Sequence, residues 1–339
     1  MKTAVLLINL GSPENASRRK VACFLFQMLN DKRVIDLPFI LRIILVNLII
    51  IPFRINKSSK KYKEYFEKGE PTLPARSLNV VDKLNNILPE NYRAFTAMRY
   101  GKPSLAKVIK KIDKEKYDRI IIFPQYPQYA EATTQSSIEK ATKFIRKIKN
   151  KPEILVIKQF HDHPAYIDCM AEKIETFDPE KYDHVLFSYH SLPIRQVDKI
   201  HPAGKCNCSE ATPENAKFCY KAACLETSRS IAEKLNVTIE NYTTSYQSQI
   251  GKDWLSPFTD ELLIEHATKG DKRVLIVSPS FVTDCLETVM DLRIEGNKLF
   301  KEHGGEKLQP VTCLNDDDKW IKALAAIIKD KADKSSIIR

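Results

Sequence analysis

Short runs of valine, isoleucine and other apolar residues recur along the chain, and helical stretches separate them. Apolar runs of about four to eight residues are typical of strands that are buried on both faces of a parallel sheet. Because helices lie between the runs, the pattern predicts sheets that are covered by helices on both faces. Eight strands are expected, at residues 4–9, 93–98, 119–124, 153–157, 184–188, 238–244, 273–278 and 309–312.

The strand pattern starts a second time near residue 160. The chain has 339 residues, which exceeds the usual size of one domain. We therefore predict two similar, doubly wound α/β domains, at residues 1–160 and 161–315, followed by a C-terminal helix and tail at 316–339.

An apolar segment at residues 37–53, LPFILRIILVNLIIIPF, interrupts this pattern and includes Arg42 and Asn47. It falls short of the roughly 20 apolar residues that a helix needs to cross a bilayer. A helix that dips into the membrane interface fits better, because basic side chains that can meet anionic headgroups follow it. A buried core helix is the alternative. The basic residues are Arg54, Lys57, Lys60, Lys61 and Lys63.

The charge balance favours anionic partners, since 54 basic residues stand against 43 acidic ones, a net charge of +11. The lysines are scattered and no nucleic-acid recognition module is present, so nucleic acid is not an expected partner. The glycines form neither of the common nucleotide-binding motifs. The N-terminal apolar run is too short for a signal peptide, which favours the reducing cytoplasm.

Three carboxylates recur every four residues, at Glu287, Asp291 and Glu295, and Asp284 precedes them. On a helix this spacing places them on one side, where like charges repel each other. No basic residue shares that side and the neighbours are apolar, so we expect the acids to face a pocket. There they would bind a divalent cation or accept protons. A solvated acidic face is the alternative.

His190 follows the predicted strand at 184–188 almost directly. Ligand sites in parallel sheets gather at the carboxyl ends of the strands. A neutral imidazole in that position can accept a proton or coordinate a metal, whereas a purely structural histidine is the alternative.

Half of the eight cysteines lie in a polar stretch, residues 201–224, that looks like an insertion. They are Cys206, Cys208, Cys219 and Cys224. In a reducing setting, clustered cysteines bind metal more often than they form disulfides. Four thiolates suit a [2Fe–2S] cluster, or Zn²⁺ as the alternative, and the spacing lacks the paired C-x-x-C of zinc fingers. The others are predicted to be buried thiols: Cys23, Cys169, Cys285 and Cys313.

Several motifs, taken in order, resemble the ferrochelatase family. They are LLINLGSP at 6–13, FPQYPQY at 123–129 with TTQSS at 133–137, SYHSLP at 188–193, YQSQIG at 246–251 with WLSP at 254–257, and residues 281–295. The resemblance spans about residues 3–325. It implies insertion of Fe²⁺ into protoporphyrin IX, the last step of heme synthesis. It also implies two Rossmann-like (chelatase-type) domains, each a parallel sheet flanked by helices, with the active site in the cleft between them.

The family's functional residues match positions of this sequence. The resemblance makes His190 and Glu287 the catalytic pair, and with Asp291 and Glu295 they would contact the metal, the acids forming a ladder on a π-helix. The residues that would contact the porphyrin are Leu10, Arg99, Tyr100, Tyr126 and Trp254. We expect Arg99 and Arg42 to meet its propionates. Cys285 is a departure, because animal members have histidine there.

Other functions compete with this one. A porphyrin or heme carrier needs an apolar pocket but gives no reason for acids stacked opposite a histidine. A coproporphyrin ferrochelatase would take a more water-soluble substrate, whereas the apolar segment favours protoporphyrin IX. A cobalt or nickel chelatase would be shorter and lack that segment. Some ferrochelatases carry a [2Fe–2S] cluster, although animal members place most of its ligands in a C-terminal extension that is missing here. We expect a cytoplasmic protein bound peripherally to an anionic membrane surface.

Overall fold

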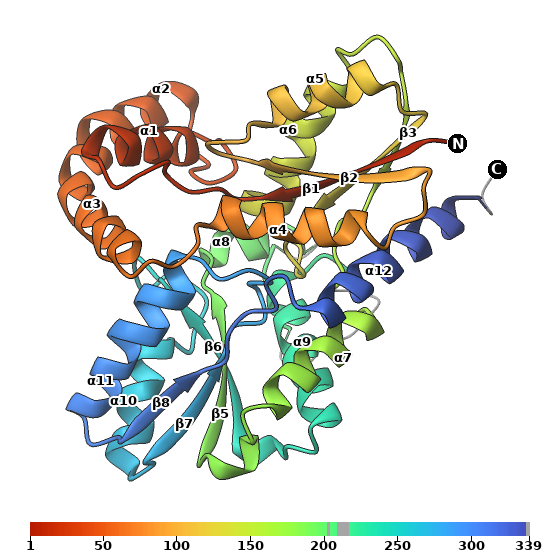
Figure 1. Ribbon diagram of the computed structural model, residues 1–339. Coiled ribbons are helices and arrows are strands. Elements are labelled where there is room, and N and C mark those ends of the chain that lie inside the picture. Colours follow the sequence, from red (N-terminus) through yellow and green to blue (C-terminus); the bar gives the residue numbers. More distant parts are fainter. Residues whose placement is uncertain (202–203, 209–216, 337–339) are drawn as a thin grey trace. The chain divides into compact units, whose positions relative to one another are not determined.

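The computed structural model describes residues 1–201, 204–208 and 217–336, and the chain forms two compact units (Figure 1). Unit 1 comprises Met1–Tyr126, Ala130–Lys158 and Asp316–Arg339, and unit 2 comprises Pro127–Tyr129 and Gln159–Asn315. Each unit contains a four-stranded parallel sheet with helices on its faces. The predicted α/β class with two parallel sheets is confirmed.

The sheet of unit 1 has the strand order β2-β1-β3-β4. Its strands are β1 Thr3–Asn9, β2 Tyr92–Met98, β3 Arg119–Pro124 and β4 Glu153–Val156. Every residue of β1 is buried, as expected for a central strand with a helical layer on each face. Alternate side chains of β1 pack with α5 and α6 in one core, and α4 contacts β1 and β2.

The helices of unit 1 include one long, unbroken helix over the apolar segment. It is assembled from α2 Phe39–Ile44, a π-helical stretch η1 Leu45–Ile50 and α3 Ile51–Glu67. The others are α1 Arg18–Leu29, α4 Leu73–Asn85, α5 Leu105–Glu115, η2 Glu131–Gln135 (π), α6 Ser136–Ile145 and α12 Asp318–Ser336. The C-terminal helix α12 contacts α4 and β4.

The sheet of unit 2 has the strand order β6-β5-β7-β8. Its strands are β5 His184–His190, β6 Tyr242–Gln247, β7 Arg273–Val277 and β8 Lys307–Pro310. The α-helices α10 Thr259–Lys269 and α11 Asn297–Glu302 contact each other, as do α7 Pro164–Glu175 and α9 Tyr220–Lys234 (Figure 1). The remaining elements are η3 Pro179–Lys181, α8 Ile194–Asp198, η4 Ile239–Asn241 and the π-helix η5 Glu287–Gly296.

All eight expected strands exist, and their largest boundary errors lie in β6 and β8. The strand expected at 238–244 begins only at Tyr242, because residues 239–241 form a 3₁₀ turn. β8 begins at Lys307, before the apolar residues that suggested it, because Lys307 pairs with Arg273 at the start of β7. A strand is set by its neighbour's register as well as by its own apolar residues.

Three of the four cysteines outside the insertion are buried thiols as predicted: Cys169, Cys285 and Cys313. The prediction is wrong for Cys23, which is exposed on α1. Each helical residue turns the chain by about 100°, so Cys23 points away from the face that carries the buried Val21, Phe24 and Leu25.

Candidate active site

His190 is the last residue of β5, a central strand of unit 2. Its Nδ1 lies 2.7 Å from the carbonyl oxygen of Ser191. A carbonyl oxygen only accepts, so Nδ1 carries the proton and the neutral ring holds its lone pair on Nε2. The hydroxyl of Tyr220 donates to the carbonyl oxygen of His190 at 2.9 Å and fixes the backbone there. The half-buried ring therefore presents Nε2 as its basic atom.

The acidic residues lie on η5, which is a π-helix as the resemblance implied. Glu287 is its first residue and is half-buried, Asp291 is also half-buried, and Glu295 is exposed. Glu295 lies near the end of the helix, and that it faces a pocket with the other two stays a prediction. The Ser248 hydroxyl donates to Asp291 Oδ2 at 3.4 Å, which links the loop after β6 to the ladder.

Asp284 does not extend the ladder, contrary to expectation. Its carboxylate is 2 % exposed and accepts hydrogen bonds from the Thr288 hydroxyl at 2.9 Å and the Asn315 side-chain amide at 2.7 Å. The Asp284 amide donates to the same Asn315 side chain at 2.9 Å. A buried carboxylate with this many internal donors is an anchor. It fixes the start of η5 to the segment after β8.

The carboxyl ends of parallel strands meet at one edge of the sheet, so the ends of β5, β6 and β7 are neighbours. His190 lies at that edge, and the chain passes from β7 to η5 there. Trp254 lies beside the segment that follows His190, because Leu255 donates to the Leu192 carbonyl and Ile194 donates to the Asp253 carbonyl, both at 2.9 Å. Unit 2 thus gathers the histidine, the ladder and the tryptophan at one sheet edge.

The other expected substrate contacts lie at the carboxyl edge of the sheet of unit 1. Tyr100 donates its amide to the carbonyl of Leu10 at 2.9 Å, so the chain segments after β1 and β2 run together. Gly11 makes this approach possible. Its φ is +100°, and a Cβ there would lie 1.9 Å from the Tyr100 carbonyl oxygen. Tyr126 follows β3 at the same edge, and burial raises the pKa of its hydroxyl.

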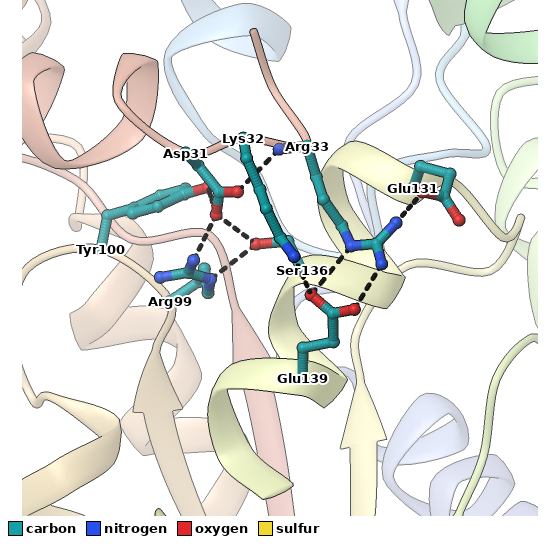
Figure 2. Close-up of polar contacts among 8 residues, drawn as sticks. All are labelled: Asp31, Lys32, Arg33, Arg99, Tyr100, Glu131, Ser136 and Glu139. Carbon is teal, nitrogen blue, oxygen red and sulfur yellow. Dashed lines mark hydrogen bonds and ion pairs between the residues drawn. The ribbon is translucent and has the colours of Figure 1, made fainter. Parts of the chain in front are cut away.

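Arg99 and Tyr100 share a carboxylate that the sequence did not reveal, that of Asp31 (Figure 2). Asp31 pairs with the Arg99 guanidinium and accepts from the hydroxyls of Ser136 at 2.6 Å and Tyr100 at 3.0 Å. Arg99 Nε also donates to the Ser136 hydroxyl at 2.7 Å. Burial opposes ionisation of Asp31, but these hydrogen bonds and the arginine charge outweigh it and lower its pKa. The Arg99 guanidinium is therefore fixed by partners within the protein, Asp31 and Ser136.

A second ion pair lies next to the first. Arg33 bonds to the carboxylates of Glu131 and Glu139, with Nε 2.9 Å from Glu139 Oε2 (Figure 2). Asp31 and Arg33 thus attach the segment before the long helix to η2 and α6. No sequence spacing signals these contacts, since Asp31 and Arg99 are far apart in the chain.

Arg42 was expected to meet a propionate, but its guanidinium is directed at backbone carbonyl groups. The residue is 7 % exposed, and Nη1 donates to the carbonyl oxygens of Leu37 at 2.8 Å and Ile35 at 3.4 Å. It holds the turn that leads into α2.

The insertion contains a group of ligand atoms that could hold a metal. The group comprises His201, Cys206, Cys208 and Cys219, whose ligand atoms all lie within 4.8 Å of one another. Burial and the neighbouring thiols raise the pKa of Cys219. His201 was not foreseen, whereas the expected Cys224 lies fully buried within α9 and is not part of the group.

The comparison with protein families decides the identity of this chain, since the ferrochelatase family model matches residues 2–332. The chain belongs to the ferrochelatase family. A ferrochelatase from Legionella pneumophila (strain Lens) is 38% identical over 335 residues, which cover 98% of this chain and 100% of the relative. A ferrochelatase from Coxiella burnetii (strain Dugway 5J108-111) is 38% identical over 339 residues, covering 97% and 93%.

This ferrochelatase also shares its fold with a solved chelatase structure. SirB from Bacillus subtilis with Fe³⁺ aligns with a TM-score of 0.50 at 11% identity and covers 99% of this chain and 98% of its own. At that identity the likeness concerns the fold alone. The family membership makes the protein a metal-insertion enzyme of heme synthesis, as the sequence motifs predicted.

Proposed function

We propose that the protein inserts Fe²⁺ into protoporphyrin IX and that His190 Nε2 accepts a pyrrole proton. The hydrogen bond from Nδ1 to Ser191 carries this proposal, because it fixes the tautomer in which Nε2 is basic. Iron entry exchanges both inner protons of the porphyrin for one Fe²⁺, so the site must accept protons as well as hold the cation.

The ladder on η5 supports the second role. Glu287 and Asp291 are half-buried and Glu295 is exposed, so the carboxylates run from a sheltered position to water. Hard oxygen ligands suit a ferrous ion in transit, and the same carboxylates can pass protons outward. We assign Glu287 to the proton and metal chemistry with His190, and Asp291 and Glu295 to the path along η5.

We further propose that the porphyrin contacts Leu10, Arg99, Tyr126 and Trp254. Tyr100, also expected to contact it, is only 1% exposed and donates its hydroxyl to Asp31 instead. The rings of Tyr126 and Trp254 are half-buried and offer flat apolar surface to a planar macrocycle. Arg99 supplies positive charge for a propionate, and Asp31 with Ser136 fixes its guanidinium. These residues lie at the carboxyl edges of their own sheets, where ligand sites of parallel sheets are found.

Protoporphyrin IX is favoured over coproporphyrin by an apolar face on the long helix. The large apolar side chains of this face are Phe39, Ile40, Leu41, Ile44, Leu48, Ile49 and Phe53, with Phe53 82% exposed. Exposed apolar patches of this kind mark interaction surfaces, here for a lipid-soluble substrate and its membrane. The alternative was a helix buried in the core, and it does not hold for this face because these side chains are exposed.

The helix Phe39–Glu67 is long and apolar enough to cross a membrane by composition. Its other side carries the buried Val46, Ile55 and Tyr62, and it packs against α1. A crossing would carry the exposed Arg18 and Arg19 of α1 into hydrocarbon, at a cost of several kcal/mol. We therefore propose that the helix lies in the interface of a cytoplasmic, anionic membrane surface.

The thiol-rich group of the insertion could hold a metal, which agrees with the coarser part of the cofactor prediction. The finer prediction was a [2Fe–2S] cluster on Cys206, Cys208, Cys219 and Cys224. Three of these cysteines lie in the group, with His201 as its fourth member, and the cluster itself stays a prediction. No step of the proposed reaction passes through this metal.

Anaerobic incubation with Fe²⁺ and either protoporphyrin IX or coproporphyrin tests the proposal. The loss of porphyrin fluorescence measures the rate of metalation. We expect faster metalation of protoporphyrin IX in the presence of anionic vesicles. A carrier would bind porphyrin with no metalation, and preference for coproporphyrin would contradict the substrate assignment.

A further inference from the structure

A buried side-chain amide lies next to His190 at the carboxyl edge of the sheet of unit 2. It belongs to Gln247, the last residue of β6, which is 4% exposed. Gln247 pairs in register with His190, the last residue of β5, and its carbonyl accepts from the Ser191 amide at 2.8 Å. Side chains that pair in register on neighbouring parallel strands point to the same face of the sheet. Gln247 and His190 therefore lie side by side on one face, on strands that are about 4.8 Å apart.

The acidic helix η5 covers that same face. Leu186 lies an even number of residues before His190 on β5, so both side chains point to one side of the sheet. Leu186 packs in one buried core with Leu292 of η5. Ser248, which directly follows Gln247, donates its hydroxyl to Asp291 Oδ2 at 3.4 Å. Gln247 thus adjoins both the histidine and the residue that contacts the ladder.

Neither polar atom of the Gln247 side chain has a hydrogen-bond partner among the described residues. A buried amide without partners lowers the stability of a fold, so packing alone gives no reason for a glutamine here. The next pair inward on the same face shows the contrast, because the hydroxyls of Ser188 and Ser245 both bond to Thr259, at 2.8 Å and 2.9 Å. The Gln247 amide therefore indicates a group that enters the site.

We propose that the side-chain oxygen of Gln247 binds Fe²⁺ as the ion passes from the ladder on η5 to the porphyrin, an inference that rests on the proposed function. Carbonyl oxygens bind divalent cations, and an amide oxygen carries no net charge. Gln247 adds a coordination position beside the carboxylates and the imidazole without adding a further negative charge. The ion is held there and can still move on to the porphyrin.

The depth of Gln247 favours the metal over the porphyrin as its ligand. Gln247 is buried, whereas His190, Glu287 and Asp291 are half-buried. A planar macrocycle needs exposed surface on which to stack, whereas a single ion needs only one oxygen atom. A small cation can therefore reach this amide where a macrocycle cannot lie against it.

The test compares Gln247→Leu with the unaltered full-length protein under anaerobic conditions. The variant should keep or gain stability in urea, because it removes two unpartnered polar atoms. Its KM for Fe²⁺ should rise about 10-fold or more, the usual effect of losing a group that supports a metal. Its kcat at saturating Fe²⁺ and its KM for protoporphyrin IX should change much less. Gln309→Leu, the same change at an amide that bonds to the Pro310 carbonyl, should leave all three values unchanged.

An unchanged KM for Fe²⁺ in Gln247→Leu would overturn the proposal, and so would a raised KM for the porphyrin alone. Calorimetric titration of porphyrin-free protein with Fe²⁺ separates this inference from the proposed function, because it requires no turnover. Weaker Fe²⁺ binding in Gln247→Leu supports the ligand even if the unaltered protein metalates no porphyrin, and equal binding contradicts it. If Gln247→Leu is unstable, Gln247→Met repeats the test, since it keeps the side-chain length and removes both polar atoms.

Discussion

The carboxylate of Asp31 forms an ion pair with the guanidinium of Arg99, and the hydroxyl of Ser136 accepts a hydrogen bond from Arg99 Nε. The Asp31 side chain is 6% exposed, so little water screens the pair. The pair joins the end of β2 to the segment that precedes the long helix. It therefore connects a proposed substrate contact with the proposed membrane surface inside unit 1.

Removing that carboxylate charge should cost stability and porphyrin affinity together. Asp31→Asn leaves Arg99 partly buried without its counter-charge, and we expect a loss of about 2–4 kcal/mol in the free energy of unfolding. Porphyrin binding, measured by fluorescence quenching, should weaken because the guanidinium is no longer fixed. Glu14→Gln, which breaks only surface pairs with Lys20 and Lys102, is the control. Unchanged stability and affinity would show that the pair does not position Arg99.

A glycine at the end of β1 should tolerate no side chain. Gly11→Ala places a Cβ against the Tyr100 carbonyl at a φ of +100°, so the backbone must shift. Gly69 has a φ of +70° with open space around it, so Gly69→Ala carries only the conformational cost, about 1 kcal/mol. We expect Gly11→Ala to lower the free energy of unfolding by at least about 2 kcal/mol more than Gly69→Ala. Equal losses in urea unfolding would contradict the close approach.

Stability should fall in mild acid because of His184, at the start of β5. Burial, helped by the nearby ring of His266, lowers the pKa of His184 to about 4 from an ordinary value of 6.5. The unfolded chain therefore binds the proton more readily than the folded one between pH 6.5 and pH 4. The folded state loses stability as the pH falls through that window.

The test is urea unfolding at pH 7 and pH 5, compared with His184→Gln. The variant removes the titrating ring, so its stability should depend less on pH over this range. His303→Ala, which removes an exposed histidine, should keep the original dependence. A slope that survives in His184→Gln would place the titrating group elsewhere.

The apolar face of the long helix should bind anionic vesicles. Leu48→Ser with Phe53→Ser removes exposed apolar area, and Lys57→Glu with Lys60→Glu reverses exposed charge. Both pairs should reduce vesicle flotation, the second most clearly at low salt, because salt screens the headgroup attraction. Lys107→Glu with Lys110→Glu makes the same charge change on α5 and should have little effect. If none of the unaltered protein floats with the vesicles, the proposed membrane surface is contradicted.

The sequence predicted what is encoded locally. Apolar runs predicted the eight strands because consecutive residues of a central strand are all buried, as in β1 and β3. The position of His190 followed from the end of such a run. The apolar segment was recognised because its side chains are consecutive along one helix.

Contacts between distant segments were not predicted. Asp31 reaches Arg99 only because β2 and the segment after α1 meet in space, and the cysteine spacing did not indicate that His201 joins the thiols. The exposed Glu295 follows Asp291 by the same four residues that separate Glu287 from Asp291. The anchored Asp284 precedes Glu287 by three residues. Their different surroundings depend on where η5 ends and on Asn315, which sequence spacing does not show.

The most direct test of the central claim is the rate of anaerobic Fe²⁺ insertion into protoporphyrin IX by His190→Ala, with His303→Ala as the control. Removal of the base at Nε2 should lower kcat at least about 100-fold, while porphyrin binding by fluorescence quenching stays close to that of the unaltered protein. Near-normal turnover in His190→Ala would contradict the account.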